Sequence, residues 1–312
     1  MISVVMATYK GGPYLAVQLD SILTQTYQDI ELVVVDDCSP DNSRQILGEY
    51  AEKDARIKLH FNEENLGCSR SFEKGCTLAT GDYVALVDQD DFWEPNKLEV
   101  LLAEIQAGDL DMAYSDCRHM DADGQLLDSS HRDRHRANGL DSTTPGFAVI
   151  AAFNSFVLGC SMMLTAEAVK RCLPFEHSRF NHDKWIVANV AAWGKVAFVD
   201  QVLFRYRLHG NQYSMRFKKN NARKKLLKHD MSVVIPFVSS EGLARILSFI
   251  DESSPNRRPY EQMINDVSKF RSGQRLSRIM FALKYAPMLF LGQRPVSQVN
   301  NVFKLAMTSE AC

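Results

Sequence analysis

Three carboxylates stand close together in the segment LVDQDDFW (residues 86–93), between an apolar run and two large aromatic residues. They are Asp88, Asp90 and Asp91. Acids this close repel one another, and an apolar neighbourhood raises the cost of ionising each of them. A bound cation would offset that cost, and a divalent metal is the simplest candidate. Because residues two apart on an extended segment point the same way, Asp88 and Asp90 can share one metal.

The elements that must position these acids are predicted from short apolar runs that alternate with segments of helical period. The expected strands are residues 2–7, 30–37, 57–61, 82–88 and 111–116, and helix-like stretches lie near 69–79 and 96–107. Strands that are apolar throughout and alternate with helices indicate an α/β fold, with a mostly parallel sheet covered on both faces. In such sheets, ligands bind at the carboxyl ends of the strands.

Polar residues follow four of the expected strands at the point where each strand ends. They are Thr8 and Tyr9, Asp36 and Asp37, Asn65 and Gly67, and the acids from Asp88 to Asp91. Any one of these groups is explained by the turn preferences of Asp, Asn and Gly. Four groups at one sheet edge predict a binding site there.

The composition limits what this site can belong to. The chain has 312 residues, of which 46% are hydrophobic and 24% charged, which is typical of one large or two smaller globular domains. Its seven cysteines are scattered without CxxC or His-paired spacing, which argues against a disulfide framework or a zinc site and favours a reducing compartment. The net charge of -2 hides an asymmetry: residues 1–204 carry 17 basic and 31 acidic side chains, and residues 205–312 carry 19 and 7.

The N-terminus and the basic tail predict where the protein works. Residues 1–9 have no basic region before the first apolar run, so we expect no signal peptide, and no apolar stretch reaches the length of a membrane span. Residues 216–229 hold seven Lys or Arg, and the apolar stretch 278–292 is interrupted by Lys284 and Pro287. These features predict a cytoplasmic protein held at the inner face of the cell membrane by anionic lipid. The alternative is a solvated helical hairpin packed on the acidic N-terminal body, and this acidic body argues against nucleic acid.

Three ordered blocks, residues 4–43, 65–98 and 182–214, resemble the family 2 glycosyltransferases with the GT-A fold, and the last block resembles rhamnosyltransferase-like members. The resemblance implies a GT-A catalytic domain over residues 1–214, followed by a basic, mainly helical region over 215–312. It also implies a divalent metal, Mn²⁺ or Mg²⁺, that stabilises the charge on a departing nucleoside diphosphate.

For the donor side, the resemblance implies roles for individual residues. Asp90 would ligate the metal, and Asp88 would contact the ribose or metal-bound water. The nucleotide would be held by Thr8, Tyr9 and Asp37. Arg70 would pair with the diphosphate, or else is a solvated arginine on a helix face.

Three further residues of the donor side keep two interpretations each. Asp36 is a ligand or a turn residue. Asp91 is a supporting group or a cap for a helix that opens at Pro95. His209 completes the metal site or touches phosphate, or else is a structural loop histidine.

For the acceptor side, the resemblance implies that Asp183 is the general base, because inversion at the anomeric carbon needs a base opposite the leaving diphosphate. The alternative is an ordinary N-cap aspartate. His182 stands where the family often has another residue, Glu among them, so no role is assigned to it. Cys160 is expected to be a packing residue without nucleophilic function.

The predicted function is inverting transfer of a sugar from a pyrimidine nucleotide sugar, UDP-hexose or dTDP-rhamnose. The acceptor would be a saccharide or a lipid-linked glycan in cell-surface polysaccharide assembly (LPS, O-antigen or capsule). The alternative from another class is a non-catalytic nucleotide-sugar or polysaccharide-binding protein on the same fold. Asp88, Asp90 and Asp183 together favour the enzyme, because a binding protein has little need of a base.

Overall fold

The computed structural model describes residues 1–131, 139–153, 157–176, 181–210, 212, 240–271 and 284–285. Its elements in chain order are β1 (Ile2–Thr8), α1 (Gly12–Leu23), β2 (Ile30–Asp36), α2 (Ser43–Lys53), β3 (Ile57–Phe61), α3 (Cys68–Leu78), β4 (Tyr83–Val87), β5 (Phe92–Trp93), α4 (Lys97–Gly108), β6 (Met112–Met120), β7 (Leu126–Ser130), α6 (Phe147–Phe153), η1 (Gly159–Ser161), β8 (Met162–Thr165), α7 (Ala166–Cys172), α8 (His182–Trp193), β9 (Val196–Arg207), α11 (Ser240–Phe249) and α12 (Arg257–Arg271). The basic segment 216–229 and all of 278–292 except residues 284 and 285 lie outside the described residues.

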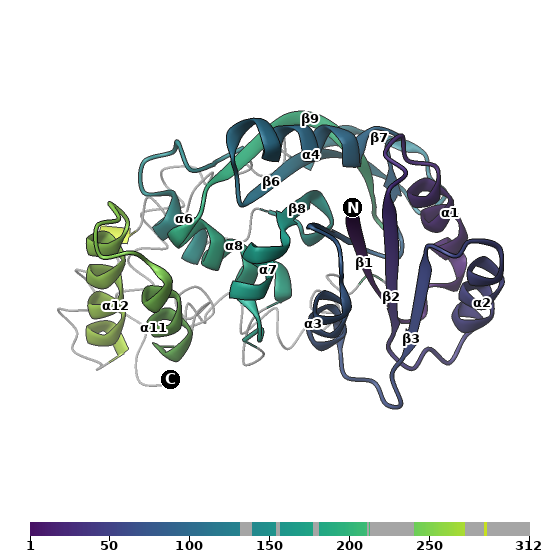
Figure 1. The fold of residues 1–312 in the computed structure, drawn as a ribbon, viewed down its shortest axis with the longest axis horizontal. Helices are drawn as coiled ribbons and strands as arrows, with labels where there is room; N and C mark the ends of the chain where they lie inside the picture. The colour runs from purple at the N-terminus through teal and green to yellow at the C-terminus, as the bar shows by residue number, and fades with distance from the viewer. Residues whose placement is uncertain are drawn as a thin grey trace.

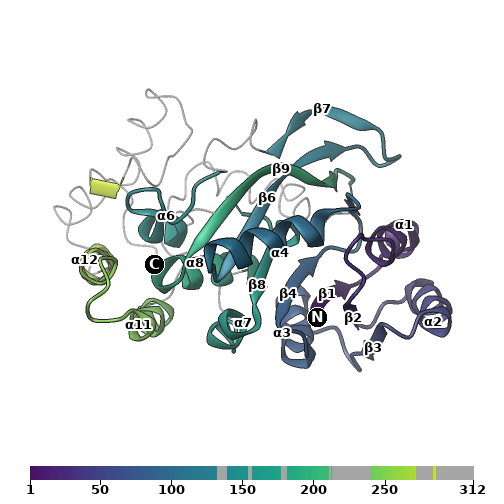
Figure 2. The same cartoon turned by 45° about the horizontal axis from the view of Figure 1, so that its top comes forward.

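One sheet runs through the molecule in the order β3-β2-β1-β4-β8-β6-β9-β5, and β7 pairs with β6 (Figures 1 and 2). The first four strands of this order are mutually parallel. Strand β8 is antiparallel to both β4 and β6, and β6 is parallel to β9. The carboxyl ends of β1, β2, β4, β6 and β9 therefore meet at the same edge of the sheet.

Helices cover both faces of this sheet, which explains why β1, β2 and β4 are almost wholly buried and mainly apolar. In β1, Val4 and Met6 pack with α1, α2 and α4 on one face, and Val5 packs with α3 and the later helices on the other. Figure 1 shows α1 and α2 at one end of the sheet and α7 and α8 beside α3 toward the other. The mixed α/β fold with a mostly parallel sheet is confirmed. The expected strands and helices lie within one or two residues of the observed ones, except that β6 extends to Met120.

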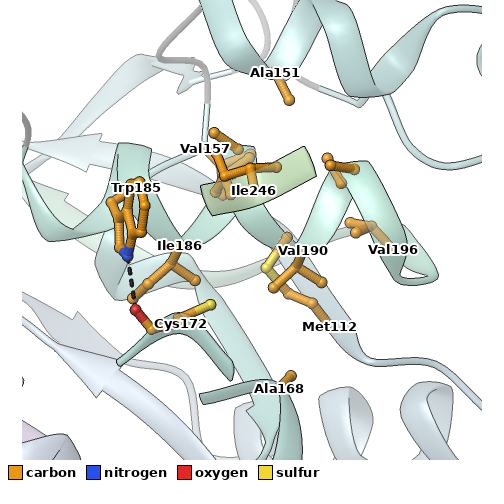
Figure 3. Close-up of a cluster of buried hydrophobic side chains, with 14 of the residues drawn as sticks. Met112, Ala151, Val157, Ala168, Cys172, Trp185, Ile186, Val190, Val196 and Ile246 are labelled. Atoms are coloured by element: carbon orange, nitrogen blue, oxygen red, sulfur yellow. Dashed lines mark hydrogen bonds between the residues drawn. The ribbon is translucent and has the colours of Figure 1, made fainter. Parts of the chain in front are cut away.

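The described helices after residue 239 share a core with the preceding part of the chain. Ile246 of α11 packs in the same cluster as Trp185 and Val190 of α8, where the indole Nε1 of Trp185 donates to the Cys172 carbonyl at 2.8 Å (Figure 3). Figure 1 shows α11 and α12 side by side next to α6 and α8. A domain boundary at residue 214 stays a prediction. Within the described residues, no helix is both long and apolar enough to cross a membrane.

Candidate active site

Asp90 and His209 meet at the carboxyl edge of the sheet. The chain leaves β4 at Asp88 and then forms β5, which pairs antiparallel with β9 through Phe92 and Arg205. This pairing lays the acidic segment against the end of β9, so His209 Nε2 lies 2.8 Å from Asp90 Oδ2. Their side chains are only 9% and 14% exposed. Of the two interpretations of His209, the structure therefore favours a place beside the proposed metal ligand.

Arg207, at the end of β9, holds the backbone of the acidic segment. Its Nε donates to the Asp90 carbonyl at 2.8 Å, and its Nη1 donates to the Ala122 carbonyl in the β6–β7 turn at 3.0 Å. The guanidinium also lies over the Tyr14 ring, with its carbon 4.7 Å from the centroid. Sequence reasoning missed Arg207, although its place two residues before His209 in RYRLHGN was a usable signal.

Asp91 points into the protein. It is fully buried, and its Oδ1 accepts a hydrogen bond from the Arg207 backbone N–H at 3.0 Å. Burial, followed by the charges of Asp90 and Asp88, raises the pKa of this carboxyl well above its usual range. The cap interpretation is wrong, because α4 begins at Lys97 and its N-cap is Asn96. Asp91 is instead the supporting group that ties the segment to β9.

Asp88 is partly buried at the end of β4. Burial, followed by the charge of Asp90, raises the pKa of Asp88 to about 7. The proton that Asp88 holds at lower pH would have to leave before a cation could bind its carboxylate. Cys160 lies beside Asp88 and Asp91 and is buried, and burial raises the pKa of its thiol well above the usual range, as expected for a packing residue.

Behind these acids lies a lysine that sequence reasoning missed. Lys97 is fully buried, its Nζ donates to the Cys160 carbonyl, and it lies 4.0 Å from the centroid of the Trp93 ring. Burial lowers the pKa of Lys97 to about 8, although the charges of Asp91 and Asp88 oppose that shift. Its burial could have been predicted from helical spacing, because Lys97 stands four residues before Leu101 and therefore lies on the buried side of α4.

Gln89, the residue between the two acids, joins the end of β4 to the end of β1. Its Oε1 accepts from Thr8 Oγ1 at 2.7 Å and from the Tyr9 backbone N–H at 2.8 Å. Its Nε2 donates to the Tyr9 carbonyl at 3.1 Å. A Cβ on Gly11 would come within 2.5 Å of Gln89 Oε1, so this close approach requires glycine. Thr8 itself is buried, and Tyr9 is partly exposed.

Asp37 holds the loop after β3 in place. Its carboxylate accepts hydrogen bonds from the backbone N–H groups of Leu66 and Gly67, both at 2.8 Å, and from Asn62 Nδ2 at 2.9 Å. A carboxylate has about four acceptor positions, so about one remains for a ligand. Asp36 is a turn residue, because its Oδ1 accepts from the Ser39 backbone N–H at 3.1 Å and pairs with Arg44.

Asp183 lies in the first turn of α8, whose N-cap is Asn181, so the N-cap interpretation of Asp183 is wrong. Its Oδ1 accepts from the Lys184 backbone N–H at 2.7 Å. The neighbouring His182 is buried and stacks on the Phe72 ring with centroids 3.9 Å apart. Glycine at position 159 lets η1 approach this helix, because a Cβ there would lie 2.9 Å from His182 Nε2.

The thiol of Cys68, at the first residue of α3, is affected by acids that follow several strands. Burial raises the pKa of Cys68, and the negative charges of four carboxylates raise it further. In falling order of effect these are Asp88, Asp183, Asp37 and Asp90. These four acids come from three separate blocks of the sequence. Arg70 is exposed on the same helix, beside Glu73 and Lys74 at a shallow pocket.

The donor set suits a hard or borderline divalent cation. Asp90 and His209 are in contact, Asp88 lies near enough that the charge of Asp90 raises its pKa, and carboxylate oxygens are the ligands that Mg²⁺ and Mn²⁺ prefer. The excess negative charge of the site also favours a cation. These residues therefore fit the metal that the resemblance implied.

Comparisons with known proteins place the chain among glycosyltransferases. The chain is 36% identical over 127 residues to glycosyltransferase GlyG of Streptococcus pneumoniae, which covers 40% of this chain and 42% of that protein. It is 28% identical over 214 residues to an uncharacterized glycosyltransferase of Nostoc sp., covering 67% and 65%. It is 34% identical over 128 residues to TuaG of Bacillus subtilis, a glycosyltransferase named for teichuronic acid biosynthesis, covering 41% and 51%. The chain thus spans about two fifths to two thirds of the length of these relatives.

Solved structures show the same fold. The crystal structure of Staphylococcus aureus TarS (residues 1–349) with UDP-GlcNAc matches with a TM-score of 0.59 and 15% identity, covering 98% of this chain and 89% of that one. A mannosyltransferase of Pyrobaculum calidifontis with GDP-Man and Mn²⁺ matches with a TM-score of 0.56 and 16% identity, covering 98% and 85%. The family model described as Glycosyl transferase family 2 matches residues 3–171. The chain therefore belongs to glycosyl transferase family 2, as its sequence blocks predicted.

Proposed function

We propose that this protein is an inverting, metal-dependent glycosyltransferase that uses a pyrimidine nucleotide sugar. The observation that supports this most directly is the contact between His209 Nε2 and Asp90 Oδ2, 2.8 Å apart, at the sheet edge where Asp37 and Asp88 also follow their strands. A site with so many acids repels an anionic donor unless a cation accompanies it. It therefore suits a nucleoside diphosphate that enters with a metal.

In this proposal Asp90, Asp88 and His209 hold the metal, which supplies charge stabilisation for the leaving diphosphate. Arg207 and Asp91 fix the backbone from which Asp90 projects, and Gln89 couples that backbone to β1. The acceptor position left on Asp37 suits the imide N–H of a pyrimidine base. Tyr9 offers its ring to that base, and Thr8 holds the turn beside it.

Asp183 is the proposed general base. It would take the proton of the acceptor hydroxyl as the new glycosidic bond forms and the diphosphate leaves from the opposite face. Its effect on both Asp88 and Cys68 supports a place facing the donor site. It lies in the first turn of α8, and a helix N-terminus is a favourable place for an acidic side chain.

The proposed donors are UDP-hexose and dTDP-rhamnose, and the proposed acceptor is a glycan or a lipid-linked glycan of cell-surface polysaccharide assembly. The relative named for teichuronic acid biosynthesis supports such an acceptor. The TarS structure with UDP-GlcNAc supports a uridine donor, although that likeness alone concerns the fold. We also propose that residues 216–229 attach the protein to anionic lipid at the inner face of the membrane. Vesicles with and without anionic lipid test this, and equal binding to both would refute it.

A donor panel tests the proposed activity. Hydrolysis of UDP-glucose, UDP-galactose, UDP-GlcNAc and dTDP-rhamnose would be measured with Mn²⁺, with Mg²⁺ and with EDTA. We expect metal-dependent turnover of at least one donor and its loss in Asp90→Asn. Asp109→Asn is the matched control, because Asp109 is exposed and has a left-handed backbone conformation that asparagine tolerates. Metal-dependent donor binding without any turnover would favour the binding protein instead.

A further inference from the structure

A second cluster of metal-ligating side chains lies at the hairpin that β6 forms with β7. Cys117, His119 and His131 each offer one ligand atom, and these three atoms lie within 4.8 Å of one another. The residues are 1%, 3% and 8% exposed, so their side chains are shielded from solvent. The two imidazole rings have centroids 6.0 Å apart and are tilted by 55°.

Strand pairing brings these residues together. Cys117 and His119 are two apart on β6, the spacing that places side chains on one side of a strand. Strand β7 pairs antiparallel with β6 with Ser130 opposite Arg118, so the next residue, His131, comes opposite Cys117. The backbone N–H of His131 acts on the Cys117 sulfur and favours its thiolate. The cluster is thus built by the register of the β6–β7 hairpin.

The charges around Cys117 favour a cation. Burial raises the pKa of the thiol well above its usual range, and the negative charges of Asp91 and Asp116 add to that effect, whereas Lys97 opposes it. A bound metal would reverse this effect, because a coordinating thiol is deprotonated outright. The negative charge of Asp116, which disfavours a bare thiolate, would stabilise a divalent ion on it.

We propose that Cys117, His119 and His131 bind a zinc ion that is separate from the metal of the donor site. One thiolate and two imidazoles suit Zn²⁺, whereas Mg²⁺ and Mn²⁺ prefer oxygen. Ligand bonds of about 2.0 to 2.3 Å place tetrahedral donors roughly 3.3 to 3.7 Å apart, so ligand atoms within 4.8 Å of one another need to close by at most about 1.5 Å. A water molecule would take the fourth position. The sequence prediction against zinc rested on spacing alone, and His131 joins the pair only through the hairpin.

The zinc ion would have a structural role. It would join β7 to β6 at the base of the hairpin whose turn carries Ala122, and the Ala122 carbonyl accepts from Arg207. Arg207 in turn holds the backbone of Asp90. Zinc would therefore stabilise one wall of the donor site without touching the donor. This inference is independent of the proposed activity, because its measurements concern metal content and stability.

The first experiment measures the metal in the full-length wild-type protein. After zinc loading and desalting, we expect about one zinc ion per chain by mass spectrometry. Removal of zinc should lower the Tm by about 5 °C, on the scale of a ligand held at 100 times its Kd. Co²⁺ in place of Zn²⁺ should give tetrahedral d–d bands and a thiolate-to-cobalt charge-transfer band. Less than about a tenth of a zinc per chain, or a cobalt spectrum without a thiolate band, would overturn the proposal.

Variants then locate the ion. Cys117→Ser and His131→Asn should each lose most of the zinc, and Cys117→Ser should lose the charge-transfer band. Cys76→Ser is the matched control, because Cys76 is also buried but lies on α3 away from the cluster. Asp90→Asn should keep zinc, which separates this site from the donor metal. Full zinc in both cluster variants would refute the assignment, and if they fail to fold, the wild-type cobalt spectrum still decides.

Discussion

Replacing Asp183 with asparagine separates a base from a structural residue. Asn keeps the size of the side chain, and its amide oxygen can still accept from the Lys184 backbone N–H that Asp183 now holds at 2.7 Å. The variant loses a negative charge in the first turn of α8, which is worth about 0.3 to 1 kcal/mol at a helix N-terminus. It also removes repulsion with Asp88, which acts in the opposite direction. We therefore expect the free energy of unfolding to change by less than about 1 kcal/mol.

The transfer rate should respond far more strongly. A positioned general base contributes about 10² to 10⁴-fold, which corresponds to roughly 3 to 5 kcal/mol in the activation barrier. Donor affinity should be nearly unchanged, because the proton transfer concerns the acceptor. The pKa of Asp88 should fall, since one of the charges that raise it is gone.

The assay is single-turnover transfer with a donor identified in the panel, combined with calorimetric donor binding and urea unfolding on the same preparation. Glu167→Gln is the matched control, because Glu167 is also an acid in the first turn of a helix, α7, and is exposed. That variant should keep wild-type transfer. A rate for Asp183→Asn within about fivefold of wild type would refute the assignment of the base, whatever the stability shows.

Three further predictions concern the buried charges of the site. Asp91→Asn should keep the Mn²⁺ affinity, measured by calorimetry, within a few fold of wild type, because a neutral side chain already suits that position. Asp90→Asn should lower the Mn²⁺ affinity at least about tenfold. Equal losses of affinity in the two variants would show that Asp91 acts as a charged ligand. Because the pKa of Asp88 is raised to about 7, the metal-free wild-type protein should lose stability as pH rises from about 4 to 7. Its affinity for Mn²⁺ should grow over the same pH range. Asp88→Asn should flatten the dependence of stability on pH, measured by thermal denaturation. Lys97→Met should raise the free energy of unfolding at pH 7, measured in urea, by about 1 to 3 kcal/mol. The gain should be smaller above pH 8, where wild-type Lys97 loses its proton. A fall in the free energy of unfolding by more than about 2 kcal/mol would instead indicate an ionised pair with Asp91.

Local patterns were enough to predict the parallel half of the sheet. The runs that became β1, β2 and β4 are short, mainly apolar and bounded by turn residues, which is typical of strands buried on both faces, whereas the run that became β3 also holds Lys58 and His60. Because these strands are parallel, their carboxyl ends lie at one edge of the sheet, so the placement of Asp37 and Asp88 at that edge was predictable as well. The start of α8 at His182 was also predictable from local sequence, because the helical pattern of apolar residues begins there.

The second half of the site depends on pairings between distant residues. Asp90 and His209 are 119 positions apart, and they meet only because β5 pairs with β9 and β9 runs parallel to β6. A two-residue strand such as β5 has no periodicity to detect. The same limit applies to His131, which reaches Cys117 through a hairpin whose register shifts at a bulge.

The three neighbouring acids show why residue type alone does not assign a role. Asp88, Asp90 and Asp91 look equivalent in the sequence, yet their surroundings separate them. Asp91 is fully buried against β9 and favours the neutral form, and Asp90 has an imidazole beside it. Burial raises the pKa of Asp88 to about 7. Because buried Lys97 lies near Asp91 and Asp88, and a cation is expected at the site, each acid that stays neutral lowers the repulsion that the others must overcome. The three acids therefore differ in role in the folded site: Asp91 ties the segment to β9, Asp90 contacts His209, and Asp88 has a raised pKa.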